Sequence, residues 1–68
     1  MDAIVRVIDS KIKSSGMTQA FVSRQANMNP DLLSRTLQGH RKLKADELVN
    51  LCEVLGLTFE DFRKTKAS

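Results

Sequence analysis

The side chains best suited to chemistry lie between residues 31 and 44, and they are hydrogen-bonding groups and cations. Four of them recur at spacings of three and four residues, which places them on one face of a helix: Asp31, Ser34, Arg35 and Gln38. Residues 34–44, which overlap the end of this helix and continue beyond it, contain four Arg or Lys residues and no acidic residue. Such a segment is suited to contacting phosphates, although a solvated charged face gives the same pattern.

The charge of the chain is unevenly distributed. The net charge is +3, with +5 in residues 1–44 and −2 in residues 45–68, so the basic side is N-terminal. Catalytic and metal-binding patterns are missing, because there is one His, one Cys and no phosphate-cradling glycine loop. A chain of 68 residues also has little material to enclose a pocket. We therefore expect no enzymatic activity, cofactor, metal or small-molecule substrate, and we interpret Cys52 as a small buried hydrophobe.

Length and hydropathy indicate one soluble domain over residues 1–68. A chain this short cannot divide its buried surface between two cores. No stretch approaches the roughly 18 apolar residues that a membrane span needs, and the first residues carry an acid where a secretory signal carries bases. We expect a cytoplasmic protein.

Apolar periodicity predicts an all-α, compact bundle of about five short helices. The apolar residues of the first helix are Val5, Ile8 and Ile12, and Asp2 is a possible N-cap. A later stripe comprises Leu48, Leu51, Cys52 and Leu55. Capping residues and glycines divide the chain into helices at about 2–15, 18–26, 30–38 and 45–55, and a last one starting near 59. Phe59 and Phe62 are expected to be at least partly core, and residues 64–68 form a polar tail.

Two of these helices form a helix-turn-helix over residues 18–39. Thr18 can cap the first, Asn29 precedes Pro30 at the start of the second, and Asn27 tolerates the positive φ of a tight turn. Such a unit presents its second helix to a partner, and the major groove of duplex DNA is wide enough for one helix.

The order of several short segments resembles the lambda-repressor/Cro-type (XRE-like) helix-turn-helix family over residues 17–62. These segments are MTQ, LLSR, QGHRK and LVNLCEVLGLTFEDF. The resemblance implies a sequence-specific regulator that binds a double-stranded DNA operator, with repression favoured. It also implies a homodimer on half-sites about one helical turn apart, associated with the nucleoid.

The resemblance assigns contacts to particular positions. Base contacts are implied for Asp31, Ser34 and Arg35, and a guanidinium such as that of Arg35 can bridge guanine O6 and N7. Asp31 could accept from cytosine N4, or act only as a favourable first-turn acid. Phosphate contacts are implied for Gln19, Gln38, Arg41 and Lys42. His40 is added to that set because an imidazole can donate to a phosphate, although a lone loop histidine is usually just solvated.

Four positions depart from the family pattern. Ser23 and Asn27 replace the usual Ala and Gly, and both are compatible with the turn. Pro30 replaces a polar side chain that often contacts a base. Phe21 lies where the family is usually polar, so we expect it to pack against another helix or, as the alternative, to form part of a partner surface. Pro30, Asp31 and Phe21 favour an alternative function, in which the scaffold binds protein instead of DNA.

Overall fold

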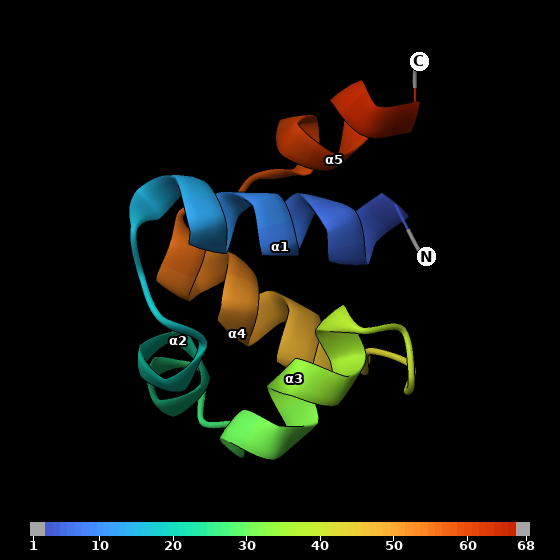
Figure 1. The fold of residues 1–68 in the computed structure, drawn as a ribbon. Helices are drawn as coiled ribbons and strands as arrows, with labels where there is room; N and C mark the ends of the chain where they lie inside the picture. Colours follow the sequence, from blue (N-terminus) through green and yellow to red (C-terminus); the bar gives the residue numbers. More distant parts are fainter. Residues whose placement is uncertain (1–2, 67–68) are drawn as a thin grey trace.

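The computed structural model describes the backbone of residues 3–66 and the side chains of residues 3–63. Five helices and no strand occur in this part of the chain (Figure 1). They are α1 (Ala3–Ser15), α2 (Gln19–Gln25), α3 (Pro30–Leu37), α4 (Ala45–Leu55) and α5 (Phe59–Lys66). The predicted all-α bundle is confirmed.

Side-chain caps fix where three of the helices begin. Thr18 accepts from the backbone N–H of Phe21 at 3.1 Å, which starts α2. Asn29 accepts from the N–H of Asp31 at 2.8 Å, and Pro30 occupies the first helical position, where its missing N–H costs nothing. At α5, the backbone N–H of Thr58 donates to Asp61 Oδ2 at 2.7 Å. These starts agree with the sequence prediction.

The turn between α2 and α3 depends on a left-handed residue. Asn27 has φ 59°, and the next amide, that of Met28, donates to the Ser23 carbonyl at 2.7 Å. Ser23 itself is fully buried, and its hydroxyl donates to the Ala20 carbonyl at 2.9 Å, so no polar atom is left unpaired there. The hydroxyl of Ser23, at a position where the family usually has alanine, is therefore compatible with the core.

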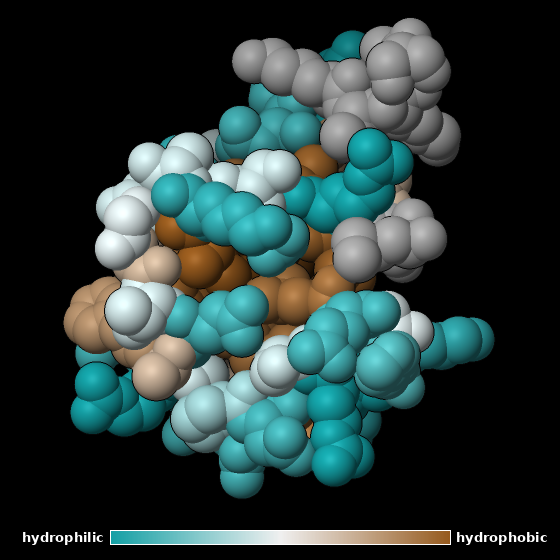
Figure 2. Space-filling view, in the orientation of Figure 1, coloured by the Kyte–Doolittle hydropathy of each residue, from teal (hydrophilic) through white to brown (hydrophobic). Residues whose placement is uncertain are grey.

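The hydrophobic core lies where α1 and α4 meet the α2–α3 unit. α1 packs against α3, α4 and α5, while α2 packs against α3 and α4. Figure 2 shows apolar residues between the upper and lower parts of the molecule, with a hydrophilic surface over the lower part, where Figure 1 places α3. The fully buried large side chains include Ile8, Val22, Leu33 and Leu51. Leu33 and Val22 therefore anchor α3 and α2 by their inner faces.

The C-terminal part differs from the prediction in two respects. The helix α5 continues to Lys66, within the segment expected to be a polar tail. Phe59 was expected to be partly core, but it is the first residue of α5 and is 74% exposed. Phe62 is confirmed as packing against the core.

Two further expectations also need correction. Phe21 is 42% exposed on α2, so it does not serve the core. Cys52 is half-buried, not fully buried, and packs at the margin of the core. The predicted N-cap Asp2 lies outside the described residues. No helix within residues 3–66 is both long enough and apolar enough to cross a membrane.

Candidate nucleic-acid interface

The outer face of α3 is exposed and polar, while its inner face is buried. Leu33, Thr36 and Leu37 are buried against the rest of the domain. Asp31, Arg35 and Gln38 are exposed, and Ser34 is partly exposed between them. The helix is therefore fixed by one face and offers hydrogen-bonding groups on the other.

Two pairs of side chains occupy this outer face, each joining residues one turn apart. Nε of Arg35 lies 3.2 Å from Oδ2 of Asp31, and Gln38 Nε2 donates to Ser34 Oγ at 3.3 Å. Exposed pairs of this kind contribute about 0–1 kcal/mol to stability. All four side chains can therefore turn to an incoming ligand at little cost.

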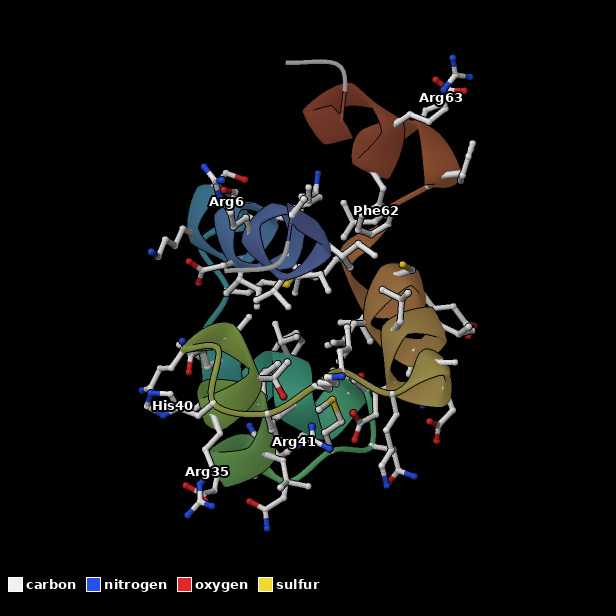
Figure 3. The ribbon with its side chains drawn as sticks, turned by 90° about the vertical axis from the view of Figure 1, so that its right-hand side faces the viewer. Arg6, Arg35, His40, Arg41, Phe62 and Arg63 are labelled. Carbon is white, nitrogen blue, oxygen red and sulfur yellow. The ribbon has the colours of Figure 1, made fainter. Side chains whose placement is uncertain are left out.

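Arg41 lies inside the loop that joins α3 to α4. Its Nη1 donates to Thr36 Oγ1 at 2.9 Å and to Glu47 Oε1 at 3.1 Å, and its Nη2 donates to Glu47 Oε2 at 3.4 Å. Only 21% of the Arg41 side chain and 13% of the Glu47 side chain are exposed. Figure 3 shows Arg41 beneath the loop, whereas Arg35 points away from the helices. The geometry differs from the solvent-facing phosphate contact expected of Arg41.

The ion pair belongs to a continuous chain of hydrogen bonds that links α3 to α4. The Thr36 hydroxyl donates to the Leu32 carbonyl at 2.8 Å while accepting from Arg41. At the other end, Glu47 Oε1 accepts from the backbone N–H of Lys44 at 3.0 Å, just before α4 begins. The last turns of α3 and the first turn of α4 are thereby tied through one guanidinium.

The same contacts lower the pKa of Glu47. Burial of its carboxylate raises the pKa, but the hydrogen bond from the Lys44 amide and the hydrogen bond and charge of Arg41 outweigh burial. The pKa of Glu47 is therefore below its ordinary value of 4.5, and the ion pair persists at neutral pH.

The remaining predicted phosphate contacts lie at the two ends of the helix-turn-helix. Gln19 is exposed as the first residue of α2. His40 and Lys42 are exposed in the loop after α3, and Gly39 turns the chain into this loop with φ 83°. The interface thus combines the outer face of α3 with hydrogen-bonding groups and cations on its flanks.

Thr36 and Glu47 were not predicted as partners of Arg41. A signal for half of this arrangement was present, because Glu47 is the third residue of α4 and an acid there commonly accepts from the N-cap amide. Nothing in the spacing indicated that Arg41 turns inward, since that depends on where the fold places Thr36 and Glu47 around the loop.

The described part of the chain offers few groups for metal binding or nucleophilic chemistry. No three His, Cys, Asp or Glu side chains among residues 3–63 gather to hold a metal ion. The thiol of Cys52 has its pKa raised by burial and by the charge of Asp61, so it stays protonated and weakly nucleophilic at neutral pH.

The unit formed by α2 and α3 has a buried inner face, and its second helix is exposed and polar with cations on its flanks. These features define a helix-turn-helix protein of the DNA-binding kind. The family model of the Cro/C1-type HTH DNA-binding domain matches residues 7–68, and the chain belongs to this family. The sequence resemblance is thereby confirmed. No curated protein and no solved structure matches the chain.

Replacement of Glu47 by Gln should destabilise the domain in a pH-dependent way. Loss of the charged acceptor should lower the free energy of unfolding by roughly 1–3 kcal/mol at pH 7, the contribution of hydrogen bonds to charged groups. Because the folded pKa lies below 4.5, this contribution is complete above pH 4.5 and is lost as the pH falls through the folded pKa.

Urea unfolding of the wild type and Glu47→Gln across pH 2–7 measures the difference. The matched control is Glu60→Gln, which removes an acid from an exposed pair with Arg63 at 3.0 Å and should change stability little. A Glu47→Gln deficit that stayed constant down to pH 2, or that equalled the control, would contradict the assigned role.

Proposed function

We propose that the chain is a sequence-specific regulator that binds double-stranded DNA by inserting α3 into the major groove. The observation that carries this proposal is the outer face of α3. It offers donors and acceptors of the kind that base edges require, on a helix whose inner face is buried. Membership of the Cro/C1-type family supports the same function.

In the proposed complex, base contacts and phosphate contacts come from different places. The first part of α3 and its middle meet the base edges, through Asp31, Ser34 and Arg35. The DNA backbone on either side of these base contacts is held by Gln19, Gln38, His40 and Lys42. Phosphate contacts of this kind orient the domain, and base contacts give its sequence preference.

Arg41 has a positioning role in this proposal instead of a phosphate contact. Its guanidinium is committed to Thr36 and Glu47 at 2.9–3.4 Å, so releasing it to a phosphate would leave Glu47 as a largely buried, unpaired charge. By holding the loop to α4, Arg41 would keep His40 and Lys42 beside α3.

Two copies of the domain are needed for tight binding in this account, because one domain of this size covers only a short stretch of DNA. A hollow between α4 and α5 is lined by Leu48, Cys52 and Phe62, with the exposed Val49 and Phe59 at its border. We assign this apolar surface to a second copy. In Figure 1 α5 lies across α1 from α2 and α3, so pairing through α5 would leave α3 free.

Repression is the proposed mode of regulation. A bound dimer excludes other proteins from the same stretch of duplex by its volume alone, and this requires no further contact. An activator would need a second surface that engages the transcription machinery.

One observation favours a scaffold that binds protein instead. Phe21 is 42% exposed on α2, beside the proposed interface, and an exposed aromatic side chain is common in protein contacts. The cations and amides that flank α3 favour DNA, and the salt dependence of binding separates the two functions.

The salt dependence should change in Lys42→Ala. Loss of one phosphate contact releases one counterion fewer, so the slope of log K against log salt should fall by about one, with binding weakened alike for all duplexes. Fluorescence anisotropy with a selected operator and a mixed-sequence duplex, from 50 to 300 mM salt, measures both slopes.

Lys11→Ala is the matched control, because Lys11 lies on α1 beside Leu57 and Asp61 and should leave the slope unchanged. Two results would contradict the proposal: a wild-type affinity independent of salt, and a Lys42→Ala defect confined to one sequence.

The proposed dimer predicts different effects for two exposed phenylalanines. Phe59→Ser should weaken self-association by at least about 10-fold, since full burial of one phenylalanine side chain contributes about 1.5–3 kcal/mol and a symmetric dimer buries two. Phe21→Ser, the control on α2, should leave it unchanged. Sedimentation equilibrium measures both variants, and equal dissociation constants for Phe59→Ser and the wild type would exclude α5 from the interface.

A further inference from the structure

An exposed ion pair on α3 joins Asp31, in the first turn, to Arg35 one turn later. The carboxylate oxygen Oδ2 lies 3.2 Å from Nε of the guanidinium, and 66% of the Asp31 side chain and 62% of the Arg35 side chain are exposed. The acid is unusual in a surface proposed to meet phosphates, because it cancels the charge of the cation best placed to contact a base. Capping does not explain it, since Asn29 already caps the helix.

The atoms of this pair leave the terminal edge of Arg35 available. A guanidinium has five N–H donors, and the acid lies against Nε, so the two terminal nitrogens keep four of them. Guanine offers two acceptors in the major groove, O6 and N7, which match a pair of parallel N–H groups. The acid and the guanine can therefore bind the same guanidinium at different edges.

Without Asp31, the same arginine would have other partners. A long cationic side chain on an exposed helix also reaches phosphate oxygens, which occur at every position of a duplex. A carboxylate beside the guanidinium repels those oxygens and favours the orientation in which Nε faces the acid. The pair is electrically neutral, so it adds little to general attraction for DNA.

We propose that Asp31 is a specificity-determining positioning residue, which holds Arg35 by its Nε edge so that the terminal edge contacts guanine and not phosphate. This inference rests on the proposed DNA-binding function. The proposal predicts opposite changes in two quantities: removal of Asp31 should strengthen binding to mixed-sequence DNA while it weakens the preference for guanine. If Asp31 only stabilised α3, its removal would weaken both the affinity for mixed-sequence DNA and the preference for guanine.

The test is a randomised-site selection with purified chains, followed by anisotropy measurements on the selected duplex and on a mixed-sequence duplex. The variants are Asp31→Ala, Arg35→Ala and the conservative Asp31→Glu. Asp9→Ala is the matched control, because Asp9 also pairs with a cation four residues on, Lys13 at 3.0 Å, but on α1. The wild type should prefer guanine at one position by about 5- to 150-fold, the discrimination given by a bidentate contact.

Asp31→Ala should reduce that preference to a few-fold and raise affinity for mixed DNA on the order of 3- to 10-fold at about 0.1 M salt, as one added phosphate contact does. Asp31→Glu should restore most of the preference, and Asp9→Ala should change neither quantity. If Arg35→Ala abolishes the preference while Asp31→Ala retains it, the inference is overturned and the proposed function stands. A wild type that binds neither duplex at low salt overturns both.

Discussion

The half-buried guanidinium of Arg41 ties the end of α3 to the start of α4. It bridges Thr36, on the last turn of α3, to Glu47, on the first turn of α4, and the backbone amide of Lys44 completes the link. Apolar packing by Leu33 and Leu37 holds the inner face of α3, but such packing is not directional. Hydrogen bonds to Arg41 are directional, and they fix the angle at which the loop leaves the helix. This link holds the loop that carries His40 and Lys42, whereas packing against α1 and α2 holds α3 itself.

The interface therefore contains arginines with opposite roles. Arg41 is 21% exposed and makes three hydrogen bonds within the domain, whereas Arg35 is 62% exposed and lies against one exposed acid. In the folded domain the first contributes to stability, and the second keeps its donors for a ligand. Exposed side chains on a helix whose inner face is buried suit specific binding, because precise contacts require a firmly held backbone.

The sequence predicted local structure better than it predicted partners. The starts of α2, α3 and α5 follow from Thr18, Asn29 and the Thr58–Asp61 pair, since each cap acts within four residues. The left-handed turn at Asn27 was predictable for the same reason. The inward contacts of Arg41 were not predicted, because a basic residue in a polar loop gives no sign of an acid six residues on that turns toward it. Phe59 was expected to be partly core and Phe21 to pack against another helix, whereas their exposure depends on where each helix lies against its neighbours. The sequence predicted which face of α3 is exposed, but not the contacts of Arg41 that tie the following loop to α4.

The most direct test of this account is an NMR titration of the ¹⁵N-labelled chain with duplex DNA at low ionic strength. The account predicts that the backbone amides of residues 31–42 and the Nε–H signal of Arg35 shift, while the guanidinium signals of Arg41 and the amides of α5 stay in place. A titration in which residues 31–42 do not respond, or in which the largest shifts fall on α4 and α5, would contradict it.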